Sequence, residues 1–214
     1  IPDAAQILDI DSLSRRIAMH RINVIDCTPL LLKEFNRYQT EPETASLNRL
    51  SSIHTFISGG DVLKRDYIDK LLDVGNVYNT YGPTESTVCA TYYPCPKTGG
   101  NFIPIGKPIS NYSVYILDPR LNLAPIGING EICISGAGIT RGYLSRPELT
   151  HEKYIPDPFQ QSLRIYKTGD LGRWLPEGAI EFTGRVDHQV KIRGFRIELG
   201  EIERHLLTHE KIKD

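Results

Sequence analysis

Residues 52–82, SIHTFISGGDVLKRDYIDKLLDVGNVYNTYG, carry the pattern that decides the fold. SIHTFISGG predicts a strand that ends in paired glycines, LKRDYIDKLLDV predicts an amphipathic helix, and NVYNTYG predicts the next strand. INVIDC at residues 22–27 predicts an earlier, buried strand because it is apolar on both faces, and helices are expected on either side of it, over 11–21 and 30–38. Strands that alternate with helices in this way indicate parallel βαβ units.

Beyond Pro94 the pattern changes, because helical periodicity gives way to short strand patterns separated by Gly and Pro turns. These strands predict a small distorted antiparallel barrel, which one helix, over 147–154, interrupts. From residue 188, HQVKIRGFRIE predicts a strand with one basic face, and LGEIERHLL predicts a final helix. The barrel strands are YSVYILD (112–118), GEICISG (130–136), RIYKTGD (164–170) and GAIEFTGR (178–185).

The two patterns together predict an α/β chain of several subdomains. We expect an αβ subdomain with parallel strands over residues 1–94, a β-barrel subdomain over 95–186 and the start of a third part over 187–214. Asp187 lies where the barrel pattern ends, and a hinge needs only a few residues at the end of an element. Asp187 is therefore a candidate hinge residue, although a solvated, salt-bridged hairpin would account for this segment equally well.

Composition and charge exclude some classes of protein. The chain has 25 Lys+Arg and 26 Asp+Glu among 214 residues, and a nucleic-acid-binding surface would need an excess of basic residues. No apolar run approaches the ~18 residues of a membrane helix, and the first residues lack the pattern of a secretory signal. The four cysteines have neither disulfide-framework nor metal-ligand spacing, so we expect free thiols, a cytoplasmic location, and no nucleic-acid or membrane partner.

The segment YNTYGPTEST, residues 78–87, has the highest density of chemically useful side chains. It follows a predicted strand, and open α/β sheets bind ligands at the carboxyl ends of their strands. Tyr81 offers a ring on which a base could stack, Thr84 a hydroxyl for a phosphoryl oxygen, and Glu85 one hard oxygen ligand for a metal. The alternative is an ordinary Gly-Pro turn with a solvated Glu85.

Three later segments carry weaker signals. SGAGITRGYL, residues 135–144, misses the spacing of the dinucleotide fingerprint, and we interpret it as a tight structural bend. In YKTGD, Asp170 could accept two hydrogen bonds from a vicinal diol such as ribose, although an Asx-turn is the commoner use of such an aspartate. In the third segment, which begins at Gly184, Arg185 and Arg193 could contact phosphate or ribose oxygens.

In their order and spacing, these segments resemble the core motifs of adenylation domains from nonribosomal peptide synthetases. More distant adenylate-forming enzymes, such as acyl-CoA synthetases and luciferases, share the YGPTE-like and TGD motifs, whereas VKIRGFRIELGEIE is more typical of peptide synthetases. The motifs that carry the resemblance are IDCTPLLL, FISGGDVL, NTYGPTESTV, IPIGKPI, GEICISGAGITRGYL, YKTGDLGRW and GRVDHQVKIRGFRIELGEIE.

The resemblance implies an ATP-dependent ligase that uses Mg²⁺. Such domains convert an amino acid and ATP into aminoacyl-AMP and pyrophosphate. They then transfer the acyl group to the phosphopantetheine thiol of a carrier domain, so a carrier domain and neighbouring synthetase domains are the implied partners. Carried over by motif position, Tyr81 would stack on adenine, Thr84 would contact the α-phosphate and Glu85 would hold magnesium.

The same resemblance assigns roles in the second half of the chain. Asp170 would bind the ribose hydroxyls, Arg185 would contact the nucleotide, and Asp187 would be the hinge of a small C-terminal lid. Two elements of the family lie outside these 214 residues: the phosphate loop of the type SGTTGxPKG and the lid lysine. We therefore expect the chain to be an internal fragment of the domain that is catalytically silent by itself.

The resemblance also identifies part of an amino-acid side-chain pocket. Asp26 is the one charge in it, and a basic substrate such as lysine or ornithine would pair with that carboxylate. An acidic or amide substrate hydrogen-bonded to Asp26, or an Asp26 paired with protein, are the competing interpretations. The pocket positions present in the chain are Asp26, Ile57, Gly59, Thr80, Val88 and Cys89.

Two alternative functions remain open on the sequence. A non-catalytic nucleotide-binding or scaffold module would share the fold, and the feature that separates it is whether Glu85, Asp170 and Arg185 converge on one cleft. An acyl-CoA ligase would have a long apolar tunnel in place of a pocket that ends at Asp26.

Overall fold

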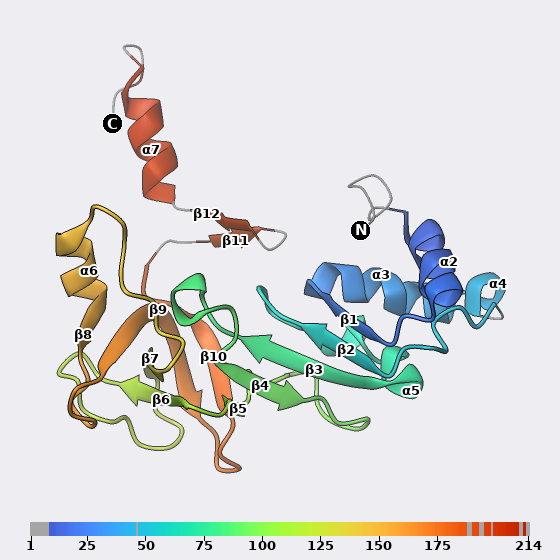
Figure 1. Cartoon of the computed structure of the whole chain (residues 1–214), viewed down its shortest axis with the longest axis horizontal. Coiled ribbons are helices and arrows are strands. Elements are labelled where there is room, and N and C mark those ends of the chain that lie inside the picture. Colours follow the sequence, from blue (N-terminus) through green and yellow to red (C-terminus); the bar gives the residue numbers. More distant parts are fainter. Residues whose placement is uncertain are drawn as a thin grey trace.

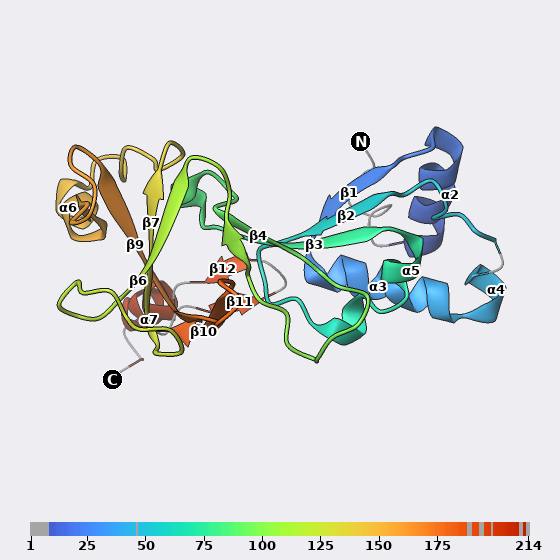
Figure 2. The same ribbon diagram turned by 90° about the horizontal axis from the view of Figure 1, so that it is seen from below.

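The structure, a computed structural model, describes residues 9–45, 47–187, 190–192, 195–197, 199–209 and 212. Two groups of strands form the body of the chain (Figure 1). Strands β1 to β3 and their helices lie at one end, and β6, β7 and β9 lie at the other with helix α6; Figure 2 shows the same separation from below. The expected fold class, an α/β chain with a parallel-stranded layer and a curled antiparallel sheet, is confirmed.

The first sheet has the strand order β1-β2-β3-β4-β5. Strands β1 to β3 are parallel, as the alternation of strands and helices predicts, while β4 and β5 are antiparallel additions on the other side of β3. The strands are β1 (Val24–Cys27), β2 (Thr55–Ser58), β3 (Asn76–Tyr81), β4 (Thr91–Pro94) and β5 (Lys107–Pro108).

Strand β1 does not have the burial that its composition predicts. Within the described sheet it pairs with β2 alone, and Val24 is 52% exposed. The prediction of a strand buried on both faces is therefore wrong: Ile25 and Cys27 pack on the core under the helices, whereas Val24 and Asp26 lie on the opposite face of the sheet and are exposed.

Helices cover one face of the parallel strands. Phe56 and Val77, which pair in register, contribute to a core with Leu32 and Phe35 from α3 and Leu71 from α5. Asp9 caps the N-terminus of helix α2, where its carboxylate accepts hydrogen bonds from two backbone amides, and α3 begins at a proline. The helices are α2 (Ile10–His20), α3 (Pro29–Thr40), α4 (Pro42–Ala45) and α5 (Leu71–Val74).

The continuous helix predicted over 63–74 is a 3-10 turn, η1 (Arg65–Tyr67), followed by the short α5. The side chain of Asn36 explains the break. Its amide donates to the carbonyl of Asp66 at 3.0 Å and accepts from the backbone amide of Lys70 at 2.8 Å. These two backbone groups would bond to each other in a continuous α-helix, so Asn36 of α3 takes both partners.

The second sheet has the order β10-β9-β7-β6, with β8 also paired to β9, and all of its pairings are antiparallel. A bridge between Gly106 and Ile180 connects it to the chain that leads into β5. Hydrogen bonding therefore continues across the expected boundary at residue 94, and the division into subdomains stays a prediction. The elements are β6 (Tyr112–Leu117), β7 (Gly130–Gly136), α6 (Pro147–Lys153), β8 (Tyr154–Pro156), β9 (Arg164–Trp174) and β10 (Ile180–Arg185).

The last part begins with two short strands where one strand over 188–198 was predicted. They are β11 (Val190–Ile192) and β12 (Phe195–Ile197), which pair antiparallel, and α7 (Leu199–Leu207) follows them. Arg193 lies outside the described residues. Among the residues that the structure does describe, no helix has the length and apolar character needed to cross a membrane.

Candidate functional site

The YGPTE segment forms a tight turn at the carboxyl end of β3. The 3-10 turn η2 (Thr84–Ser86) is followed by Thr87 and Val88, both with positive φ, at 56° and 73°. Gly82 is required here, because a Cβ at this position would lie 2.7 Å from the carbonyl oxygen of Val88. The turn leaves Thr84 exposed and buries Glu85, which is 7% exposed.

Tyr81 connects the first sheet to the second. Its ring packs in the core cluster of the barrel, and its hydroxyl donates to Oδ2 of Asp170 at 2.6 Å. Burial, and then the charge of Asp170, raises the pKa of Tyr81, so the phenol stays protonated and remains a donor at neutral pH. The adenine-stacking role stays a prediction, and in this structure the ring is 8% exposed.

Asp170 lies on β9 opposite Arg185 of β10. Its backbone amide donates to the hydroxyl of Thr168 at 2.9 Å, and its Oδ1 accepts from Nη1 of Arg185. The aspartate side chain is 4% exposed and that of the arginine 13%. The Asx-turn alternative therefore does not describe this residue's side chain, which forms a buried ion pair and a tyrosine contact.

Arg185 also reaches the predicted hinge. Its Nε and Nη2 donate to the two carboxylate oxygens of Asp187 at 2.7 and 2.8 Å. Burial opposes the charge of Arg185, but the hydrogen bonds that it donates to Asp187 and the charge of Asp170 outweigh burial and raise the pKa of the guanidinium. One arginine thus joins the candidate ribose ligand to the candidate hinge.

Glu85 contacts a different residue of the barrel. The hydroxyl of Tyr143 donates to Oε1 of Glu85 at 2.8 Å and lies 3.3 Å from the hydroxyl of Tyr166 on β9. Burial is the main cause that raises the pKa of Tyr143 to about 12, and burial likewise raises the pKa of Tyr166. Both phenols are therefore protonated at neutral pH and can serve as hydrogen-bond donors.

The glycine-rich segment after β7 fixes the backbone of the turn. The amide of Thr140 donates to the carbonyl of Glu85 at 2.9 Å, and the hydroxyl of Thr87 donates to the carbonyl of Gly138 at 2.7 Å. Tyr112 on β6 donates to the carbonyl of Ser86 at 2.8 Å. The interpretation of residues 135–144 as a bend was therefore incomplete, because this segment also holds the YGPTE turn.

These contacts link the predicted residues to β9. Tyr81 reaches Asp170 directly, and Arg185 pairs with the same carboxylate. Glu85 reaches Tyr166 through the hydroxyl of Tyr143. Tyr166 and Asp170 both belong to β9, and between them the register of β9 against β7 shifts, from Lys167 to Leu171, with Gly169 at a positive φ of 73°. The YGPTE turn therefore links the three predicted residues to one strand of the barrel: Asp170 is part of β9, Arg185 pairs with Asp170, and Glu85 reaches β9 through Tyr143. The sequence analysis missed Tyr143 and Tyr166, although both lie inside motifs that it quoted.

The donor groups at the turn suit magnesium and a phosphate. Glu85 supplies a carboxylate and Thr84 an exposed hydroxyl, and Mg²⁺ usually takes one or two protein carboxylates and completes its shell with water and substrate phosphate. Within the described residues no group of three or more His, Cys, Asp or Glu side chains could hold a metal. One carboxylate beside an exposed hydroxyl fits a magnesium ion whose other ligands are water and a nucleotide phosphate.

The predicted amino-acid pocket lies on the sheet face opposite the helices. Asp26 pairs in register with Ile57, and Gly59 is so close to Thr80 that a Cβ would lie 2.6 Å from the threonine hydroxyl. Asp26 is exposed in this structure, so it does not bear the desolvation cost expected for a buried carboxylate.

The remaining two pocket positions follow the turn. Val88 is 75% exposed, whereas Cys89 is half-buried. Burial, and then the charge of Asp26, raises the pKa of the Cys89 thiol. These residues form an open surface here, and whether they line a substrate pocket stays a prediction.

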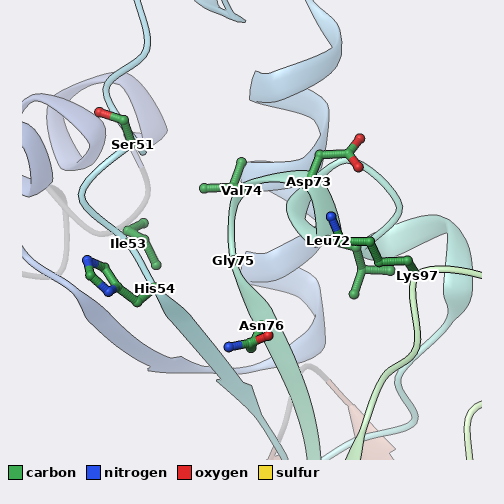
Figure 3. Close-up of a pocket in the computed structure, with 9 residues that line it drawn as sticks. All are labelled: Ser51, Ile53, His54, Leu72, Asp73, Val74, Gly75, Asn76 and Lys97. Carbon is green, nitrogen blue, oxygen red and sulfur yellow. The ribbon is translucent and has the colours of Figure 1, made fainter.

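A separate pocket lies at the other end of the same strands. Its volume is about 400 Å³ and it opens beside the amino ends of β2 and β3 (Figure 3). None of the predicted site residues lines it. Its lining residues are Ser51, Ile53, His54, Leu72, Asp73, Val74, Gly75, Asn76 and Lys97.

Comparison with known proteins identifies the family. Residues 1–144 match the family described as AMP-binding enzyme. Bacitracin synthase 2 of Bacillus licheniformis is 46% identical over 209 residues, which are 97% of this chain and 8% of that protein. Surfactin synthase subunit 1 of Bacillus subtilis (strain 168) is 46% identical over 215 residues, 97% of this chain and 6% of that protein. The chain thus spans less than a tenth of the length of these relatives.

Solved structures agree with this relationship. NpsA-ThdA, an artificially fused Adenylation-PCP di-domain NRPS from Klebsiella oxytoca, matches with a TM-score of 0.78 and 26% identity, over 96% of this chain and 41% of that one. Holo-PA1221, an NRPS protein containing adenylation and PCP domains, matches with a TM-score of 0.82 and 28% identity, over 92% of this chain and 34% of that one. The chain belongs to the AMP-binding enzyme family, among the adenylation domains of nonribosomal peptide synthetases.

Proposed function

We propose that the domain containing this chain activates an amino acid as aminoacyl-AMP. The observation that carries the proposal is that contacts from the YGPTE turn reach β9 twice, through Tyr81 to Asp170, which pairs with Arg185, and from Glu85 through Tyr143 to Tyr166. Titratable side chains from the turn and from the barrel that are joined through buried tyrosines are candidates for a binding site. Membership in the AMP-binding family gives the class of nucleotide that such a site would take.

The first half-reaction joins the amino acid to AMP. One oxygen of the amino-acid carboxylate attacks the α-phosphorus of ATP, and the bond from that phosphorus to the bridging oxygen breaks as pyrophosphate leaves with the electron pair. Two anions must approach each other, so positive charge is needed to offset their repulsion. Arg185 would supply part of that charge, and the magnesium held by Glu85 would polarise phosphate oxygens when bound.

The other residues of the site would orient the nucleotide. Thr84, exposed at the turn, would donate its hydroxyl to the α-phosphate, and Asp170 would accept hydrogen bonds from the ribose hydroxyls. Tyr81 would contact the adenine while its hydroxyl holds Asp170. Because both oxygens of Asp170 already accept hydrogen bonds from Tyr81 and Arg185, the ribose would have to share this carboxylate with them.

The second half-reaction would transfer the acyl group to a carrier domain. The phosphopantetheine thiol attacks the acyl carbon, a thioester forms, and the bond to AMP breaks. Two structural relatives combine adenylation and PCP domains, which supports a carrier partner and neighbouring synthetase domains. Asp187 would serve as the hinge of the lid that moves between the two steps.

The substrate we propose is a basic amino acid. Asp26 is the one charged residue among the predicted pocket positions, and a lysine or ornithine side chain would form a charge-assisted hydrogen bond with it. The 214 residues by themselves are expected to be inactive, because the family's phosphate loop and lid lysine lie outside them. Four unpaired cysteines fit a reducing compartment, so a cytoplasmic location remains part of the proposal.

Amino-acid-dependent exchange of labelled pyrophosphate into ATP tests this function in the complete domain. We expect exchange with lysine or ornithine, and a loss of about 10²-fold or more in Glu85→Gln and Asp170→Asn, since each removes a charge from the site. The 214-residue chain should show none. Nucleotide binding without exchange would identify a scaffold instead, and exchange only with fatty acids would identify an acyl-CoA ligase.

A further inference from the structure

The YGPTE carboxylate is held by a side chain from a segment with no assigned chemistry. Glu85 is nearly buried, and the hydroxyl of Tyr143 donates to its Oε1 at 2.8 Å. The two residues are 58 positions apart, and Tyr143 ends the glycine-rich stretch that also binds the backbone of the turn. Both the backbone and the carboxylate of Glu85 are therefore fixed by the same stretch of chain.

The position of the Tyr143 hydroxyl is itself determined by its neighbours. It lies 3.3 Å from the hydroxyl of Tyr166, and its ring meets the ring of Tyr154 edge-on at a centroid distance of 5.7 Å. The backbone amide of Tyr143 donates to Thr150 at 2.9 Å, which anchors the residue to α6. A tyrosine that is held at its hydroxyl, its ring and its backbone can fix the orientation of the carboxylate to which it donates.

We propose that Tyr143 is a positioning residue that orients Glu85 for the divalent metal. The inference rests on the metal role of Glu85 proposed above and extends it to the glycine-rich segment. By occupying one carboxylate oxygen, the Tyr143 hydroxyl sets the plane of the carboxylate and hence the direction in which the other oxygen faces. Outer contacts of this kind typically change metal affinity by roughly 10–100-fold when they are lost.

The test measures Mn²⁺ binding to the complete domain in the presence of a non-hydrolysable ATP analogue. The EPR signal of free Mn²⁺ reports how much of the metal remains unbound. Tyr143→Phe keeps the ring and removes only the hydroxyl, and it should weaken Mn²⁺ binding roughly tenfold. Tyr166→Phe should weaken it in the same direction. The Mg²⁺ concentration that half-saturates pyrophosphate exchange should rise in parallel, while the KM for the amino acid stays unchanged.

Tyr154→Phe is the matched control, because it removes a hydroxyl from the same cluster that bonds Thr140 at 2.6 Å. It should leave Mn²⁺ binding unchanged. If Glu85→Gln weakens Mn²⁺ binding and Tyr143→Phe does not, the positioning role is wrong and the metal role stands. If Glu85→Gln leaves Mn²⁺ binding unchanged, the metal role fails and the positioning role fails with it.

Discussion

The two regions that the family resemblance assigns to ATP and to the amino acid are built differently. In the nucleotide region, Glu85 and Asp170 are 7% and 3% exposed and hydrogen-bond to other side chains. In the amino-acid region, Asp26 is exposed and Val88 is 75% exposed. Side-chain contacts of the nucleotide region join the two sheets of the chain. The residues of the amino-acid region are instead positioned by strand register and by the geometry of the turn. Substitutions should therefore affect both stability and function in the first region, and function alone in the second.

Asp170→Ala is expected to have the largest effect and tests whether the nucleotide region contributes to stability. It would leave the buried Tyr81 hydroxyl without its acceptor and remove the least exposed carboxylate that faces Arg185. Removing one partner of a buried ion pair typically costs several kcal/mol, so we expect the free energy of unfolding to fall by about 3 kcal/mol. Urea denaturation of the 214-residue chain measures this loss.

Asp187→Ala is the matched control, because it removes the other carboxylate bound by the same guanidinium. The Asp187 side chain is 46% exposed, and exposed ion pairs contribute at most about 1 kcal/mol. Equal losses in the two variants would mean that burial does not distinguish the nucleotide region, and the comparison would fail.

Gly138→Ala should have the next largest effect. A Cβ at this position would overlap the hydroxyl oxygen of Tyr112, which itself holds the carbonyl of Ser86. Overpacking of this kind costs typically about 1–3 kcal/mol, and the variant should lose stability within that range, as measured by urea denaturation. Gly100→Ala, where a Cβ meets nothing within 4 Å, should not lose stability.

A second substitution would establish the cause of the stability lost in Gly138→Ala. Tyr112→Phe removes the oxygen that a Cβ at residue 138 would meet first, so the double variant should recover part of the lost stability. Failure to recover any of it would identify another source of the strain, either the backbone or the ring carbon of Tyr112 that would lie 2.6 Å from the new Cβ.

The sequence predicted the pieces of the nucleotide region but not how they are connected. Periodicity places Tyr81 at the end of a strand and Asp170 in a strand, because both depend on local pattern. The hydrogen bond between them spans 89 residues, and no local pattern specifies which side chain meets which. The motif resemblance nevertheless named both residues, whereas Tyr143 was passed over because its segment was judged by glycine spacing alone.

The errors about the first sheet have the same origin. The apolar positions of residues 63–74 predict a helix, yet Asn36, some thirty positions earlier, takes two of its backbone partners. The composition of β1 predicts burial, but burial depends on what packs against each face of the sheet, and composition does not contain that information.

Ser58 follows the predicted pocket position Ile57 on β2 and lies on the opposite face of the strand. Ser58→Ala should raise the free energy of unfolding slightly, whereas the variants above lower it. Among the described residues, the Ser58 hydroxyl is buried with no hydrogen-bond partner. Removing an unsatisfied buried hydroxyl should stabilise the chain by up to about 1 kcal/mol. Ser135→Ala, which removes a buried hydroxyl that donates to the carbonyl of Arg164 at 3.1 Å, should destabilise it by a similar amount. Urea denaturation of both variants compares the two signs directly.

The smallest effect on stability, and the clearest test of the amino-acid region, is expected for Asp26→Ala. Because the carboxylate is exposed, the free energy of unfolding of the 214-residue chain should change by less than about 0.5 kcal/mol. In the complete domain, the preference of pyrophosphate exchange for lysine or ornithine over leucine should fall about tenfold or more, as expected for one charge-assisted hydrogen bond of about 1.5–3 kcal/mol. A large loss of stability with an unchanged preference would reverse the assignment, because Asp26 would then belong to the protein's own packing and not to the substrate.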